Sequence, residues 1–281
     1  MDAQEVWHTW RRILSDPKFS EVLFTRGVEA LKAEFTLTPS EREICLAYSR
    51  TPKQTQWFVT NYRYRLVSSV CFALETCAPL TWRLLMAHEL DARALAENFL
   101  NTNKWIDHGP YVYHLCRSVL NYLRTEFSSR ILYLHDLIEL ESQAGELMQK
   151  LAQIPWAPVG TAALSDFGGE SSPVSFQRTE NALVAVTESD VRPWLRDPSQ
   201  IGKMDLNPGP QYLLIYLPDA RSRVRYVSIG KLGHELFSSL DRPRTLAEVT
   251  ELPLEKLEVR QAVENTLRMF IRSGVVTWRR S

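Results

Sequence analysis

Residues 211–232 read QYLLIYLPDARSRVRYVSIGKL, and this stretch decides how the second half of the chain folds. Residues 211–217 are rich in β-branched and aromatic side chains, which favour a strand. Residues 223–229 alternate in polarity, with Val224 and Tyr226 on one face and arginines on the other. The segment between the two runs contains proline and aspartate, which are typical of turns. The stretch therefore predicts a β-hairpin.

Helical periodicity follows this hairpin. A helix is predicted from about residue 229 to residue 240, and Thr245-Leu246-Ala247-Glu248 forms a capping box that starts a short second helix. A third helix is predicted over residues 255–273, and Gly274 supplies the left-handed conformation that ends it. Residues 275–278 then return as a short strand. The order β-β-α-α-α-β predicts a small winged helix-turn-helix.

The first half of the chain carries a helical pattern almost throughout. Thr38-Pro39-Ser40-Glu41 is another capping box, and Pro52 marks the next helix start. That long helix is expected to end at Pro79, because proline cannot donate a hydrogen bond to the preceding turn. Its predicted core face is a stripe of residues four apart, namely Phe58, Tyr62, Leu66 and Val70.

These patterns predict that the chain consists of two domains and a linker. We expect an all-α helical bundle over residues 1–153 and a winged-helix domain over residues 182–281. Residues 154–181 are rich in proline, glycine and serine, which is typical of a linker or a long loop. The predicted fold class is α+β.

Composition narrows the function. The 281 residues hold 33 Lys plus Arg and 33 Asp plus Glu, so the formal net charge is zero. This balance does not fit a dedicated nucleic-acid binder. No apolar run approaches the ~20 residues of a membrane helix, and the acidic N-terminus does not resemble a secretory signal. Four cysteines are too few for a disulfide framework. We expect a cytoplasmic protein with no membrane or nucleic-acid partner.

Groups that catalyse reactions or bind metals do not converge in the sequence. The four cysteines lack metal-ligand spacing, and His108 and His114 are six residues apart, on different faces of a helix. No nucleophile elbow, phosphate-binding glycine loop or His-Glu-x-x-His motif is present. The run Tyr62-Arg63-Tyr64-Arg65 mixes aromatic and basic residues, but a helix places Tyr62 in the core and the arginines at its margin. The sequence therefore predicts a protein that is not an enzyme and holds no metal or cofactor.

Both halves of the chain contain stretches that resemble known families. Residues 226–237, YVSIGKLGHELF, followed by residues 240–249, LDRPRTLAEV, resemble PqqD-like peptide-recognition elements of peptide natural-product biosynthesis. Four stretches of the first half look like the helical domain of MbnC-like and TglI-like partner subunits of multinuclear non-haem iron oxidative enzymes. They are residues 61–66, 75–79, 95–100 and 133–141.

This resemblance implies a non-catalytic subunit that binds a ribosomally made precursor peptide and presents it to a TIM-barrel iron enzyme, as a heterodimer. The peptide would add as a strand to the edge at residues 223–228 and lie beside the third helix. Four basic residues and one acidic residue between 219 and 231 give a local charge of +3, so we expect an acidic peptide. The predicted peptide-binding residues are Arg223, Val224, Arg225, Tyr226, Val227, Ser228, Leu257, Arg260, Glu264 and Arg268.

A winged-helix DNA-binding regulator is the alternative. Its third helix would place Arg260, Arg268 and Arg272 in a groove of the duplex. Against this, Arg260, Glu264 and Arg268 are spaced as an ion-pair ladder on a solvated face.

Overall fold

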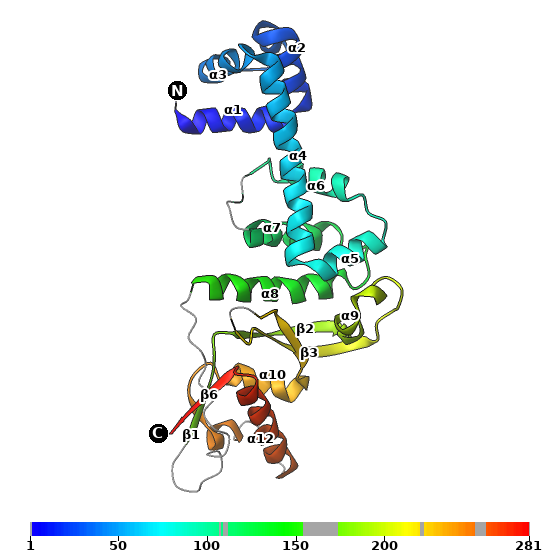
Figure 1. The fold of residues 1–281 in the computed structure, drawn as a ribbon, viewed down its shortest axis with the longest axis vertical. Coiled ribbons are helices and arrows are strands. Elements are labelled where there is room, and N and C mark those ends of the chain that lie inside the picture. The colour runs from blue at the N-terminus through cyan, green and yellow to red at the C-terminus, as the bar shows by residue number, and fades with distance from the viewer. Residues whose placement is uncertain are drawn as a thin grey trace. The chain divides into compact units, whose positions relative to one another are not determined.

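The computed structural model describes residues 2–106, 108, 112–153, 174–219, 222–250 and 257–280, with only the backbone of residues 250, 257–260 and 280. The chain mixes helices with small antiparallel sheets, in line with the expected α+β class. Figure 1 shows the order of the elements along the chain, and contacts divide the chain into two units. The helical unit comprises Met1–Thr76 and Glu89–Tyr122, and the mixed unit comprises Cys77–His88 and Leu123–Ser281.

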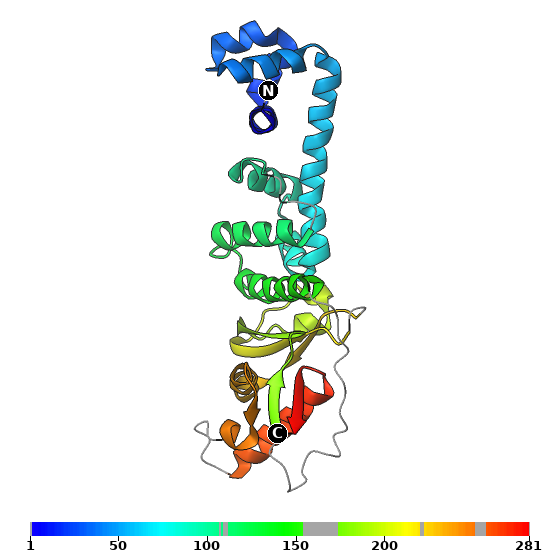
Figure 2. The ribbon, with the colours of Figure 1, turned by 90° about the vertical axis from the view of Figure 1, so that its left-hand side faces the viewer.

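The helical unit is built around one long helix, α4, with three helices gathered near its N-terminal end (Figure 2). Its elements are α1 (Ala3–Ser15), α2 (Pro17–Glu34), α3 (Pro39–Ser49), α4 (Pro52–Cys77), α6 (Ala92–Thr102) and most of α7 (Val112–Glu126).

Local signals set the helix ends as predicted. Thr38 and Glu41 form the capping box of α3, with distances of 3.1 Å and 2.9 Å between side-chain oxygens and backbone nitrogens. The helix that starts at Pro52 ends at Cys77, two residues before Pro79. The predicted core face of this helix is only partly right, because Val70 is fully buried whereas Phe58 is 53% exposed.

The mixed unit places helices on both faces of an antiparallel sheet. The sheet has the order β2-β3-β4, and α8 packs on β2 (Figure 1). A second sheet has the order β5-β1-β6. The helices are α5 (Pro79–Ala87), α8 (Leu134–Gln153), α9 (Arg192–Arg196), α10 (Gly230–Ser239), α11 (Leu246–Thr250) and α12 (Leu257–Arg272). The strands are β1 (Val174–Arg178), β2 (Ala182–Ser189), β3 (Pro208–Tyr216), β4 (Arg225–Ser228), β5 (Arg244–Thr245) and β6 (Val276–Arg280).

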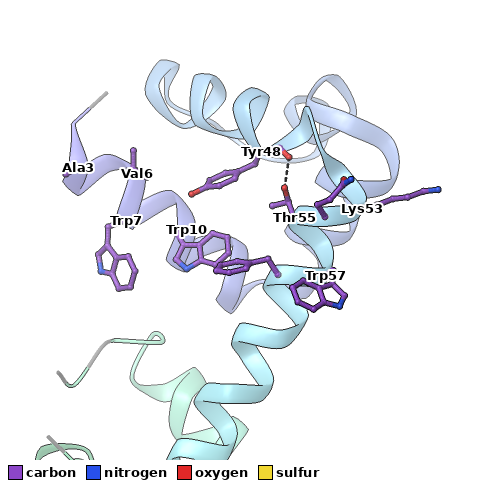
Figure 3. Close-up of a pocket in the computed structure, with 10 residues that line it drawn as sticks. Ala3, Val6, Trp7, Trp10, Tyr48, Lys53, Thr55 and Trp57 are labelled. Carbon is purple, nitrogen blue, oxygen red and sulfur yellow. Dashed lines mark hydrogen bonds between the residues drawn. The ribbon is translucent and has the colours of Figure 1, made fainter. Parts of the chain in front are cut away.

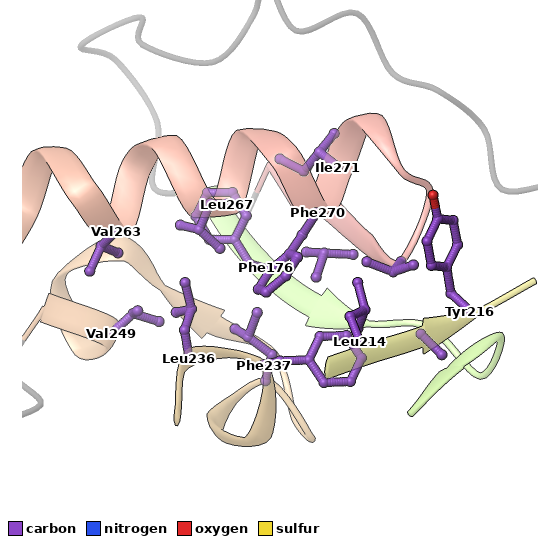
Figure 4. Close-up of a cluster of buried hydrophobic side chains, with 14 residues drawn as sticks. Phe176, Leu214, Tyr216, Leu236, Phe237, Val249, Val263, Leu267, Phe270 and Ile271 are labelled. Carbon is purple, nitrogen blue, oxygen red and sulfur yellow. The ribbon is translucent and has the colours of Figure 1, made fainter. Parts of the chain in front are cut away.

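One hydrophobic cluster joins the second face of this sheet to α10 and α12 (Figure 4). Leu214 of β3 meets Phe237 of α10 and Phe270 of α12, and the two phenylalanine rings lie edge to face with centroids 5.5 Å apart. The predicted hairpin of β3 and β4 and the predicted Thr245 capping box are both present. Gly274 has the expected positive φ of 69°.

The grouping of the elements differs from the predicted domains. α5 and α8 belong to the mixed unit, because the apolar side chains of α8 are covered by α5 and the β2–β3 sheet and not by a helical bundle. Residues 174–178, predicted as linker, form β1, whose Phe176 is 1% exposed and pairs with Arg244 and Trp278. The linker prediction is wrong there, because partners some 70 to 100 residues away stabilise the strand. Residues 154–173 lie outside the described residues.

In the described part of the chain, no single helix has the length and apolar character of a membrane span. The consecutive helices α4 and α5 meet that criterion only when taken together.

Candidate functional site

Strand β4 is the edge of its sheet: within the described residues it pairs with β3 alone. The register runs from Leu213 opposite Ser228 to Tyr216 opposite Arg225. Just beyond the strand, Ile229 donates its N–H to the carbonyl of Tyr212 at 3.0 Å. Alternate residues of an antiparallel strand bond to the same neighbour. Val227 and Arg225 therefore continue the bonding to β3, and Tyr226 and Ser228 turn their backbone N–H and C=O groups toward the open edge.

Side chains on both faces hold this short strand in place. Val227 packs against the hydrophobic cluster on the α10 and α12 side. Tyr226 points to the opposite face, where burial and, to a smaller degree, the charge of Glu141 on α8 raise the pKa of its hydroxyl. Arg225 and Ser228 are exposed. Strand β4, which carries the open backbone edge, is thus held by side-chain packing on both faces of the sheet.

A hollow of about 810 Å³ lies beside Arg225, between the end of the β3–β4 hairpin and α12. Among the described residues that line it are three arginines and one glutamate, a net charge of +2. The α12 residues lie at i, i+3, i+4, i+7, i+8 and i+11 counted from Gln261, so they share one face of the helix. The described residues that line it are Tyr216, Pro218, Arg225, Gln261, Glu264, Asn265, Arg268, Met269, Arg272 and Ser273.

The structure brings only some of the predicted peptide-binding side chains together. Arg225, Glu264 and Arg268 line the hollow, whereas Tyr226 and Val227 point into the layers on either side of the sheet. Arg223 is exposed, Val224 is half-buried and both precede β4, while Ser228 is exposed at its end. The side chains of Leu257 and Arg260 lie outside the described residues.

Arg272 is the notable lining residue that the predicted peptide set omitted. It follows Glu264 and Arg268 at steps of four residues, so helical periodicity alone could have added it. Tyr216 and Pro218 could not be found in this way, because their place in the hollow depends on the hairpin packing against α12.

Arg63 of the aromatic and basic run makes its contacts inside the helical unit, whereas Arg65 is exposed and Tyr62 is only half-buried. Arg63 donates from Nε to the carbonyl of Leu14 and from Nη2 to that of Ile13, both at 2.8 Å. These carbonyls belong to the last turn of α1, which has no further helical donors. Tyr62 lies edge to face with Trp10, with ring centroids 5.9 Å apart. The run therefore stabilises packing between α1 and α4.

No group of three or more His, Cys, Asp or Glu side chains with metal-binding geometry occurs among the described residues. The cysteines are all free thiols, and Cys45 and Cys116 are buried. Burial raises the pKa of Cys45 to about 11 and also raises that of Cys71. Both thiols are therefore protonated and weakly nucleophilic at neutral pH.

No family model matches the chain, and no curated protein is similar enough to count as a relative.

Proposed function

We propose that the chain is a non-catalytic recruitment subunit, which binds a precursor peptide and presents it to a multinuclear non-haem iron oxidative enzyme in peptide natural-product biosynthesis. The observation that carries this proposal is the open edge of β4 beside the arginine-lined hollow of α12. An exposed edge with an adjoining groove is the arrangement by which peptides add as an extra strand.

Backbone bonding would supply the affinity in this mode. The N–H and C=O groups of Tyr226 and Ser228 face the open edge, so an extended peptide can bond to all four. Such an exposed edge is also a risk for aggregation, and positive charge on an edge strand lowers that risk. Arg225 therefore has two uses, which the experiment below separates.

Charge would supply the specificity. Successive side chains of a strand point to opposite faces, so every second peptide residue would face the hollow. There Arg225, Arg268 and Arg272 outnumber Glu264. The arginine fork is well suited to carboxylates, which it binds through two parallel hydrogen bonds. We therefore infer a peptide with acidic residues at alternate positions.

The element order supports a winged-helix arrangement. Helix α10, strand β5, helices α11 and α12 and strand β6 follow one another, and β5 and β6 both pair with β1. The winged helix is thus proposed to be completed by β1, a strand that precedes the module in the chain. A DNA-binding role would use the same α12 arginines, but Glu264 shares their hollow and opposes phosphate binding.

Peptides selected from a random display library on the intact chain would test the proposal. Ser228→Pro removes the N–H that faces the open edge and leaves the bonds to β3 in place, a position where proline is tolerated. We expect it to weaken peptide binding by about tenfold or more. Arg225→Glu with Arg268→Glu is expected to weaken acidic peptides more than neutral ones. Arg196→Glu, an exposed arginine on α9, is the matched control.

Circular dichroism must show that each variant is folded. Full peptide affinity in folded Ser228→Pro would overturn the edge-strand mode. Full affinity in the folded double-glutamate variant would leave the arginines as protection against aggregation only. Tight, salt-dependent binding of duplex DNA by the wild type, lost in the same double variant, would favour the regulator instead.

A further inference from the structure

The helical unit has an apolar groove formed by α1, α3 and α4 (Figure 3). Its volume is about 1120 Å³. Trp7 and Trp10 of α1 line one side and Trp57 of α4 lines the other, and Phe58 of α4 and Tyr48 of α3 also line the groove. Three of these side chains are substantially open to solvent: Trp7 is 36% exposed, Trp57 67% and Phe58 53%.

The groove residues repeat as the core face of a helix does. On α1 they are Ala3, Val6, Trp7 and Trp10, at i, i+3, i+4 and i+7. On α4, Gln54, Trp57 and Phe58 lie at i, i+3 and i+4, and the polar residues Lys53 and Thr55 also line the groove. Each stripe is the kind that a globular protein buries against another helix. Two such stripes therefore border a space that one further helix would fill.

Side chains that line the groove pack against one another. Trp10 is only 7% exposed, and its ring centroid lies 5.6 Å from those of Tyr48 and Phe58. Thr55 of α4 donates its hydroxyl to the carbonyl of Tyr48 at 3.1 Å, which ties α3 to α4 (Figure 3). A preformed surface loses little conformational freedom when a partner binds, so more of the contact energy appears as affinity.

One end of the groove is positive. Among the described residues that line it, Lys53 is the only charged one. Lys53 also lies in the first turn of α4, where the backbone N–H groups give the helix its positive end, and this turn carries no acidic residue. The complementary group on an occupant is a carboxylate.

We propose that this groove binds an amphipathic helix of a partner protein, with large apolar side chains at i, i+3 or i+4 and i+7 and with acidic residues at one end of that stripe. The groove is larger and more open than small-molecule pockets, which typically measure ~300–1,000 Å³. A second copy of the chain would bring hollow against hollow through the same surface, whereas a single helix is convex and fits between α1 and α4. This proposal does not depend on what binds at β4.

Helical peptides provide the test. A display library of helix-forming sequences would be selected on the intact chain, and the affinity of the selected peptides would be measured by fluorescence anisotropy. We expect large apolar residues at helical spacing and glutamate or aspartate near one end. Trp57→Ser with Phe58→Ser is expected to weaken binding by about thirtyfold or more, as truncation of central aromatic residues does. Phe72→Ser is the control: it lies on α4 outside the groove, is 59% exposed, and should change affinity by less than about twofold.

Charge reversal makes the test specific. Lys53→Glu is expected to weaken the acidic peptide about tenfold at low salt and to bind better a peptide in which lysine replaces the acidic residues. Equal loss in the Phe72 control, selected peptides without acidic residues, or no rescue by the lysine peptide would overturn the proposal. It would also be overturned if wild-type chain sedimented as a dimer that Trp57→Ser with Phe58→Ser converted to monomer, because the occupant would then be a second copy.

Discussion

A buried carboxylate should make the mixed unit more stable at mildly acidic pH than at alkaline pH. Glu141 of α8 is 2% exposed and accepts hydrogen bonds from the backbone nitrogens of Leu80 and Thr81, both at 2.8 Å. These donors begin α5, whose N-cap residue, Ala78, offers no side-chain acceptor. Glu141 thus caps α5 from another helix. Burial is the largest influence on its pKa and raises it to about 7.

Proton linkage gives the size and the sign of the pH dependence of stability. The pKa of Glu141 is about 7 in the folded chain and has an ordinary value of 4.5. Since the folded state binds this proton more tightly, the contribution to stability is complete below about pH 4.5 and is lost as pH rises through 7. The difference between the two pKa values corresponds to about 3 kcal/mol in the free energy of unfolding, most of which is lost between pH 5 and pH 8.

Glu141→Gln removes the titrating group and keeps the shape of the side chain. Urea-dependent hydrogen exchange of α8 amides, corrected for the intrinsic exchange rate, would report the free energy of unfolding of the mixed unit at each pH. The wild type and the control Glu146→Gln, an exposed position on the same helix, should lose about 2–3 kcal/mol more than Glu141→Gln over this range. Other titrating groups cancel in that comparison. Parallel pH profiles for wild type and Glu141→Gln would refute the reasoning.

Three further outcomes test separate parts of the structure. Gly202→Ala should destabilise the mixed unit by about 1–3 kcal/mol in urea unfolding, because Gly202 has a φ of 77° and an added Cβ would overlap that of Ala87. Unchanged stability would mean that this close approach is absent. Arg63→Met should destabilise the helical unit by about 1–3 kcal/mol, since two carbonyls of α1 lose their donors. Arg63→Lys should lose less stability than Arg63→Met, and equal stability of these two variants would contradict the capping role. Arg223→Glu with Arg225→Glu should weaken binding of an acidic peptide in a titration and leave the circular dichroism spectrum unchanged, because both side chains are exposed; unaltered affinity would place the peptide elsewhere.

Elements with local signals could be predicted from the sequence, and those that depend on distant partners could not. The capping boxes at Thr38 and Thr245 each need only four residues, and Gly274 ends α12 by its own backbone freedom. The strands β1 and β5 are too short to be recognised from composition, because they form only when β1 pairs with β5 and β6. The role of Glu141 was likewise hidden, since a glutamate in a helix gives no sign that another helix begins beside it.

The two candidate surfaces also differ in how far the sequence predicted them. The hairpin pattern correctly placed the edge strand and Arg225, and helical periodicity placed Glu264 and Arg268 on one face of α12. The groove of the helical unit was not predicted, because the spacing of Phe58 with Tyr62, Leu66 and Val70 is typical of a buried helix face. A sequence pattern indicates that a side chain is suited to burial, but it does not say whether the chain itself supplies the covering helix.

Hydrogen exchange at single amides of β4 tests the central claim most directly. Tyr226 and Ser228 turn their N–H groups to the open edge, whereas Arg225 and Val227 bond to β3 within the same four-residue strand. Saturating the intact chain with a selected acidic peptide should slow exchange at Tyr226 and Ser228 by about tenfold or more and leave Arg225 and Val227 nearly unchanged. Unchanged exchange at Tyr226 and Ser228, with the peptide demonstrably bound, would show that the edge of β4 is not the peptide-binding strand.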